Sequence, residues 1–144
     1  MGNLKQRLIK PGRDFNYAEG VKVKNDTGSS IAADKIVYVS GYEGPYLKVS
    51  LAIASSDDTC SGRLMITKHA IPDGGYGIAL PWKLVTGVDT DDVTAAGDPL
   101  FLSASSAGDF TDTAPALKVY VGHAITKAED GAYLFCGEGA NRAV

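Results

Sequence analysis

Two histidines, His69 and His123, are the side chains of this sequence best suited to general acid–base chemistry near neutral pH. His123 lies within residues 117–125, an alternating apolar segment, which predicts a histidine packed across a strand. His69 has no nucleophile or acid beside it, and the sequence has no G-x-S-x-G segment. A small hydrolase that uses Asp57 or Asp89 with His69 is a hypothesis that needs these groups within hydrogen-bond reach in one pocket. The sequence favours a protein that is not an enzyme.

Acidic residues and cysteines lack the spacing of calcium and zinc sites. Residues 89–92 read DTDD, which has the D-x-D start of a calcium loop but neither its central glycine nor its closing glutamate, so we expect a solvated loop. Cys60 and Cys136 have no zinc-like spacing; two reduced thiols are expected, with a disulfide as the alternative. The glycines of residues 74–77 precede no helix and no Lys-Ser/Thr pair, unlike a phosphate loop. We therefore expect neither a cofactor nor a metal ion.

Composition and charge limit the classes of partner. The chain has 144 residues, with 14 basic and 17 acidic side chains and a net charge of −3, which gives no electrostatic basis for binding nucleic acid. No apolar run reaches the roughly 18 residues of a membrane span, so no membrane partner is expected. Four aromatic residues could form a stacking platform for sugars or bases, although packing at a core or edge is the commoner role. They are Tyr42, Tyr46, Tyr76 and Trp82.

The elements that must position these residues are short strands. Residues 76–88 are apolar at both alternating phases, and Pro81 predicts a break between two short strands because it has no backbone N–H. Residues 89–96 could hold one helical turn, capped by Asp89 or Thr90. Roughly eight short strands with little helix predict an all-β fold, an antiparallel β-sandwich or β-barrel. Besides those in 76–88, the expected strands are residues 20–24, 36–40, 46–54, 63–67, 99–103, 117–125 and 132–136. Residues 25–28 predict a hairpin turn.

Two pairs of these strands resemble each other in sequence. The segment VYVS at residues 37–40 matches LFLS at 100–103, and LKVSLAIA at 47–54 matches LKVYVGHA at 117–124. The copies are about 63 to 70 residues apart, too far for a solenoid repeat. The pattern predicts a degenerate duplication within one domain, with approximate internal symmetry.

The two ends of the chain differ in composition from its centre. Residues 1–19 are rich in basic residues, are interrupted by Pro11-Gly12 and show no sustained period, which predicts an extended N-terminal arm. Such an arm can be a frayed terminus or a segment that orders on a partner. We therefore expect an arm at 1–19, a β-domain at 20–137 and a small-residue tail at 138–144. The expected docking residues of the arm are Leu4, Arg7, Leu8, Ile9, Arg13 and Phe15.

Turn and strand motifs along residues 20–136 resemble a β-domain that recurs in the virion proteins of tailed bacteriophages. The resemblance is carried by VKVKNDTG at 21–28, ADKIVYVSG at 33–41, GVDT at 87–90 and AGDPLFLS at 96–103. Further on, that pattern has a glycine, a threonine run, a proline and a V-G-x-A strand. This sequence has at the corresponding places Gly108, the threonines at 111–113, Pro115 and VGHA at 121–124. These motifs punctuate turns and strands and are not catalytic signatures.

The resemblance implies a structural role outside catalysis. Its members are capsid decoration (cement) proteins and tail-fibre or baseplate proteins, and a short chain with an arm and no stalk is closer to the former. We therefore expect a protein that binds the outer surface of a phage capsid and cements neighbouring capsomers. Its expected partners are the major capsid protein and further copies of itself, as a homotrimer or homodimer. It would be found on the virion exterior and, during assembly, in the host cytoplasm. The alternative is a tail-fibre or baseplate module that is structural or binds the host.

Overall fold

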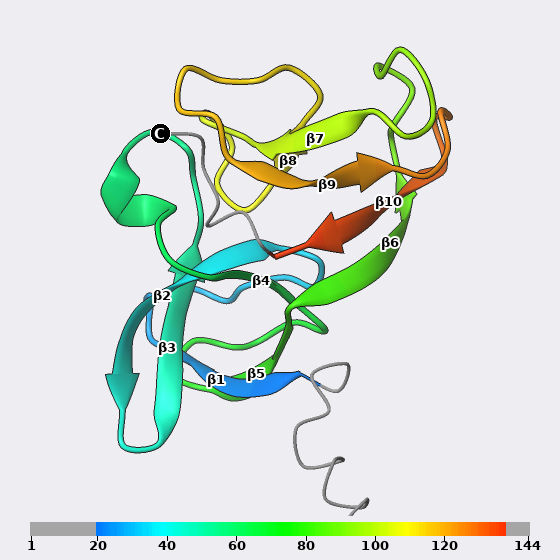
Figure 1. Ribbon diagram of the computed structural model, residues 1–144. Coiled ribbons are helices and arrows are strands. Elements are labelled where there is room, and N and C mark those ends of the chain that lie inside the picture. The colour runs from blue at the N-terminus through cyan, green and yellow to red at the C-terminus, as the bar shows by residue number, and fades with distance from the viewer. Residues whose placement is uncertain (1–19, 138–144) are drawn as a thin grey trace, which may run out of the picture.

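The computed structural model describes residues 20–137, which form an all-β structure of two packed layers (Figure 1), as the strand pattern predicts. Five strands close into a barrel in the order β1-β3-β2-β4-β5, and five form a second sheet in the order β6-β10-β9-β7-β8. The barrel strands are β1 (Val21–Asn25), β2 (Ile36–Glu43), β3 (Tyr46–Leu51), β4 (Leu64–Thr67) and β5 (Tyr76–Leu80). The second sheet contains β6 (Trp82–Val88), β7 (Pro99–Leu102), β8 (Phe110–Thr111), β9 (Tyr120–Ala124) and β10 (Gly131–Cys136). The 3-10 helix η3 (Asp57–Thr59) is the one helix in this range.

Pro81 separates the two layers. It stands between the end of β5 and the start of β6, so the predicted break between two short strands is confirmed. Because proline cannot donate to a ladder, the chain leaves the barrel here and enters the second sheet. The backbone also ties the layers together, since Gly137 N–H donates to the Pro81 carbonyl at 2.7 Å and Leu64 N–H donates to the Gly137 carbonyl at 3.3 Å.

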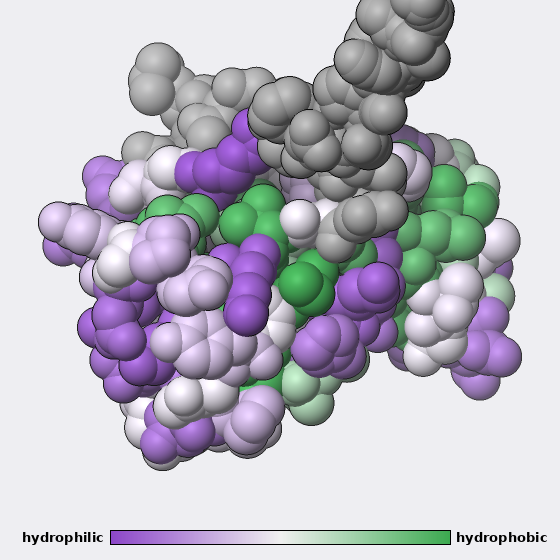
Figure 2. Space-filling view, turned by 90° about the horizontal axis from the view of Figure 1, so that it is seen from below, coloured by the Kyte–Doolittle hydropathy of each residue, from purple (hydrophilic) through white to green (hydrophobic). Residues whose placement is uncertain are grey.

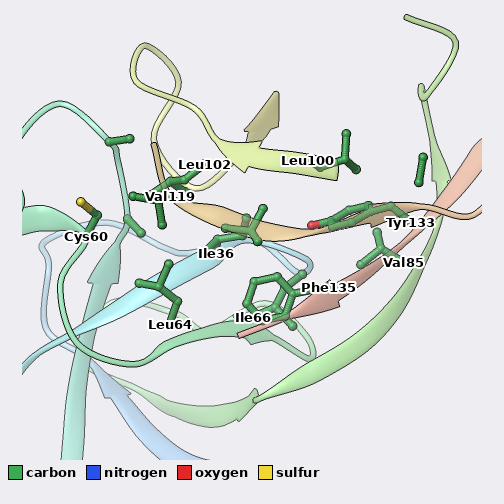
Figure 3. Packing of buried hydrophobic residues seen from close by; sticks show 14 of the residues in the cluster. Ile36, Cys60, Leu64, Ile66, Val85, Leu100, Leu102, Val119, Tyr133 and Phe135 are labelled. Carbon is green, nitrogen blue, oxygen red and sulfur yellow. The ribbon is translucent and has the colours of Figure 1, made fainter. Parts of the chain in front are cut away.

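The apolar core has two parts. One fills the barrel and contains Val23, Val37, Val49 and Met65, among others. The larger part lies between the barrel and the inner face of the second sheet (Figure 3). It contains Ile36, Leu64, Ile66 and Leu80 from the barrel and Val85, Leu100, Leu102, Tyr133 and Phe135 from the sheet. Alternate residues of β2 and β4 therefore serve the two parts, which explains why all of β4 is buried.

The sequence predicts an antiparallel sheet, but one pair of barrel strands is parallel. β1 pairs in parallel with β3 and antiparallel with β5. The predicted hairpin after β1 is therefore wrong, although the turn itself forms. Buried Asn25 builds this turn, because its Nδ2 donates to the carbonyls of Ser29 at 2.7 Å and Ile71 at 2.9 Å. These bonds lead the chain to a bridge between Ile31 and Ile71 instead of back along β1.

Two further predictions need correction, and one stays a prediction. Residues 89–96 form turns and no helix, because the Asp98 carboxylate accepts the N–H groups of Thr94 and Ala95 and holds an open loop. β9 begins at Tyr120, three residues later than predicted at 117. The duplication stays a prediction: the two similar strand pairs are both antiparallel, with β2 and β3 in the barrel and β7 and β9 in the second sheet.

Candidate interaction surface

The second sheet has one face against the barrel and one face turned away from it. Its inner residues, such as Tyr133 and Phe135, are buried, and the residues between them are at least partly exposed. We call the set that points away from the barrel the outer sheet face. At strand positions it consists of Trp82, Leu84, Thr86, Pro99, Phe101, Thr111, Tyr120, His123, Ala132, Leu134 and Cys136, and Ile125 directly follows β9.

Strand register places the outer sheet face in contiguous rows. Leu84 lies opposite Leu134, and Leu134 lies opposite His123, so one row crosses β6, β10 and β9. Trp82 lies opposite Cys136 in the next row. Trp82 and Leu84 are 52% and 53% exposed, so two large apolar side chains of edge strand β6 project into solvent.

Aromatic side chains extend the same face across β9 and β7. The Phe101 and Tyr120 rings meet edge to face with centroids 6.4 Å apart, and Tyr120 is 39% exposed. Burial, and to a lesser degree the neighbouring Cys136, raises the pKa of Tyr120 above its ordinary value. Because β10 pairs with β9, the outward residues of these two strands lie on one continuous surface.

The outer sheet face carries no Asp, Glu, Lys or Arg at any of its strand positions in the described part of the chain. Antiparallel sheets with one solvated face normally alternate apolar and polar residues, so that the outward face is polar. The barrel surface follows that rule, with the ion pairs Lys24–Glu43 and Lys48–Asp26 at 3.0 Å each. The outer sheet face is thus uncharged, with exposed Trp82 and Leu84 beside the polar side chains Thr86, Thr111 and His123.

The space-filling view shows where hydrophobic residues reach the surface at the barrel end. Figure 2 shows the molecule from below, with mainly hydrophilic residues on the left and hydrophobic residues in the centre and on the right. The right side is the side on which β6 lies in Figure 1.

Gly122 sets which β9 residues reach the outer sheet face. The pairing of β9 with β7 shifts register between Leu100 and Phe101, opposite this glycine. A Cβ atom at Gly122 would lie 2.0 Å from the Leu134 carbonyl oxygen, so only glycine fits there. The register shift changes the phase of β9 and turns His123 outward, where uninterrupted alternation would bury it. His123 is half-buried and lies across from Leu134 of β10, so the predicted cross-strand position is confirmed while the facing is not the one that alternation predicts.

The predicted aromatic platform is assembled only in part. Tyr46 and Tyr76 meet edge to face with centroids 5.0 Å apart on the barrel, and the Lys22 ammonium is 5.1 Å and 5.3 Å from their centroids. Tyr42 belongs to the β2–β3 hairpin of the barrel, and Trp82 lies in the second sheet. The six predicted docking residues of the arm, from Leu4 to Phe15, lie outside the described residues.

The candidate catalytic groups have local backbone partners or lie in different elements. The His69 Nδ1 atom lies 3.0 Å from the Ala70 carbonyl oxygen, and the Asp89 carboxylate accepts the N–H of Asp91 at 2.9 Å. Asp57 belongs to η3, and the pocket that Asp89 lines does not include His69. Among residues 20–137, no group of three or more His, Cys, Asp or Glu side chains is placed to hold a metal ion.

Cys60 is buried, and its thiol donates to the Ser56 carbonyl at 3.2 Å. No helix among the described residues is long and apolar enough to cross a membrane.

A cavity of about 270 Å³ lies between the barrel and the second sheet. Asp34, Lys35, Asp109 and Tyr133 contribute to its lining. Lys35 pairs with Asp109 at 2.6 Å, and Asp34 pairs with Lys83 of β6. These pairs join segments of the barrel to segments of the second sheet, so the charges at this cavity serve the junction between the two layers.

Removal of the Tyr133 hydroxyl should not destabilise the protein. Tyr133 is 1% exposed and lines the cavity between the two layers, and no hydrogen bond joins its hydroxyl to another of the described residues. Tyr133→Phe should therefore change the free energy of unfolding at pH 7 by less than about 1 kcal/mol. Urea denaturation followed by circular dichroism measures this difference. A loss of stability would show that the hydroxyl has a partner.

The same substitution should alter the response to alkaline pH. Burial first, and then the carboxylates of Asp34 and Asp109, raise the pKa of Tyr133 well above its ordinary value. Above about pH 10, where an unfolded tyrosine ionises, the folded state therefore binds more protons than the unfolded state, and stability falls as pH rises. Tyr133→Phe should flatten this decline, whereas Tyr42→Phe, at an exposed position, is the control.

Comparisons with known proteins do not place this surface or this fold in a family. No protein-family model, no curated protein and no solved structure matches the chain.

The sequence did not identify the residues of the outer sheet face as a set. One signal was present, because residues 76–88 are apolar at both phases. These residues form β5 and the edge strand β6, which Pro81 separates. Leu134, Tyr120 and Phe101 join it only through strand pairing over long sequence distances.

Proposed function

We propose that this chain is a structural virion protein that binds the outer surface of a phage capsid and cements neighbouring capsomers. The observation that carries the proposal is the uncharged outer sheet face, since a surface of this kind is suited to burial against protein. The resemblance of residues 20–136 to a phage virion β-domain is the reason for proposing a phage capsid as the surface that is bound. The major capsid protein is then the partner, and the capsid exterior is where the chain acts after assembly in the host cytoplasm.

In this proposal the arm attaches the β-domain to the capsid. Its apolar residues Leu4, Leu8, Ile9 and Phe15 would insert between capsid side chains, and Arg7 and Arg13 would add polar contacts. An extended segment of this type can pair with the edge of a sheet on its partner. Each contact is modest, but many symmetric copies multiply it, so that cementing works through avidity.

Co-sedimentation with empty, expanded heads of the phage that encodes the chain tests this proposal. The full chain should bind saturably, and a full-length variant with Leu8→Asp and Ile9→Asp should bind at least about 30-fold more weakly, because charge is placed at two anchor positions. Lys5→Gln is the matched control in the arm. Equal thermal stability of all three proteins would show that the β-domain is intact. Absence of head binding by the full chain would refute the proposal.

A tail-fibre or baseplate module that binds the host is the second candidate. The paired rings of Tyr46 and Tyr76 beside Lys22 favour it, because aromatic faces next to a cation are a common way to bind sugars or anionic groups. Binding of the chain to host envelopes, reduced by Tyr76→Ala and accompanied by no binding to heads, would establish this candidate instead.

A further inference from the structure

Tyr133 directs a buried hydroxyl into the cavity between the two layers. It is 1% exposed, and no hydrogen bond joins its hydroxyl to another of the described residues. Burial first, and then the carboxylates of Asp34 and Asp109, raise the pKa of Tyr133. Because both carboxylates line the cavity, the hydroxyl that they act on faces it. In Figure 3 the hydroxyl oxygen lies at the end of the ring nearer to Ile36, which directly follows the lining residue Lys35. Buried hydroxyls normally have a partner, and this cavity is the place for one.

The cavity is larger than a bridging water requires. Its volume is about 270 Å³, whereas one water molecule needs about 10–15 Å³ measured in the same way. Ala33 and Gly87 at its rim are exposed, so the cavity opens to solvent. Its apolar wall includes Val85 and the ring of Phe110, which packs on the Tyr133 ring with centroids 4.5 Å apart. A small organic group therefore has both room and access.

The charged side chains at the cavity leave one carboxylate oxygen open. Asp34 Oδ1 accepts a hydrogen bond from Lys83, and Asp34 Oδ2 accepts none from the described residues. Asp109 is fully engaged, because its Oδ1 accepts from the Lys35 ammonium at 2.6 Å and its Oδ2 accepts from the Ser106 hydroxyl. The charge of Lys35 is thereby matched, and Asp34 offers the remaining acceptor.

Strand β6 adds backbone acceptors to the same cavity. Its residues from Val85 to Val88 belong to the lining, and β10 is its one neighbour in the sheet. The carbonyls on its other side therefore have no ladder partner among the described strands. The carboxylates of Asp34 and Asp109 also make the potential at the Tyr133 hydroxyl negative. Both properties favour a cation that carries several N–H donors.

We infer that this cavity is a binding site for an alkyl guanidinium group. A guanidinium is planar and has five N–H donors and no acceptor. It can therefore bind the Tyr133 hydroxyl oxygen, the open Asp34 oxygen and the free carbonyls of β6 together. Its alkyl chain would lie against Val85 and Phe110. The group can belong to a small organic cation or to an arginine side chain of a partner protein. This inference goes beyond the proposed function and does not rest on it.

Titration of the full chain with ethylguanidinium chloride tests this inference, with sodium chloride as the control for ionic strength. Two-dimensional NMR should show saturable shifts of the amides of residues 85–88 and 108–110, with a dissociation constant of about 1–10 mM. Ethylurea has nearly the same shape and no charge, so it should bind at least about ten-fold more weakly. Equal binding of ethylurea, or shifts spread over the whole surface, would overturn the inference.

Two variants locate the ligand. Tyr133→Phe keeps the ring and removes the hydroxyl, so it should raise the dissociation constant by at least about ten-fold. Asp34→Asn should have a similar effect, and asparagine tolerates the φ of 61° at this position. Tyr42→Phe removes an exposed hydroxyl on the barrel and should leave binding unchanged. Binding that Tyr133→Phe does not weaken would place the ligand elsewhere and overturn the inference.

Co-sedimentation with empty phage heads distinguishes the two sources of the guanidinium. If saturating ethylguanidinium releases the chain from heads and Tyr133→Phe binds heads more weakly, the group is an arginine side chain of the capsid. If neither change affects head binding, the site takes a small organic cation. Absence of saturable binding up to about 50 mM ethylguanidinium would show that the cavity holds only solvent. That result would overturn the inference and leave the proposed cement function standing.

Discussion

Replacement of Gly122 by alanine should abolish stable folding or lower the free energy of unfolding by more than about 4 kcal/mol. The added Cβ atom would lie 2.0 Å from the Leu134 carbonyl oxygen and 3.2 Å from the Phe135 Cα. Both atoms belong to the backbone of β10, so no side-chain rotation relieves the clash. The two central strands of the second sheet would have to separate, and the outer sheet face would lose its register.

Gly97→Ala separates this clash from backbone strain. Gly97 has a φ of 93°, and a Cβ atom there would meet nothing within 4 Å. Alanine at this position should therefore cost only the strain of a left-handed conformation, about 1 kcal/mol. Chemical denaturation followed by circular dichroism compares the two variants. If Gly122→Ala were as stable as Gly97→Ala, the close approach of β9 to β10 would be refuted.

Phe135→Ala should lower the free energy of unfolding by about 3–5 kcal/mol. Phe135 is fully buried in β10, at the centre of the core between the barrel and the second sheet (Figure 3). Its removal leaves a cavity that the paired strands on either side cannot close, because their backbones are fixed by the ladders to β6 and β9.

Leu134→Ala is the control for the orientation of β10. Leu134 is the neighbouring residue and points to the outer sheet face, so its truncation should cost about 1 kcal/mol or less. Urea denaturation at one protein concentration measures both variants. Equal losses for Phe135→Ala and Leu134→Ala would contradict the assignment of the two faces.

Strand positions were largely predictable because they depend on local chemistry. Runs of apolar residues in alternation predicted strands in the regions where the barrel strands lie. Pro81 predicted the boundary between β5 and β6, because a proline cannot donate a hydrogen bond to a ladder. β8 was not predicted, since the strand is two residues long and has no pattern of its own. It forms because Phe101 and Leu102 of β7 offer it a partner.

Strand pairing was not predictable, because it is decided by contacts between distant residues. The pairing of β1 with both β3 and β5 closes the barrel, and the alternation of residues within each strand does not indicate these partners. In β9, continued alternation would place His123 inside, and only the register shift at Gly122 reverses it. The candidate site therefore depends on one glycine whose role is visible only beside Leu134 of the next strand.

Cryo-electron microscopy of phage heads with and without the chain tests the central claim most directly. The proposed cement function predicts additional density outside the shell, at symmetric positions that bridge neighbouring capsomers, and this density should hold two layers of strands per copy. Density confined to the tail or baseplate, or heads that look the same with and without the chain, would contradict it.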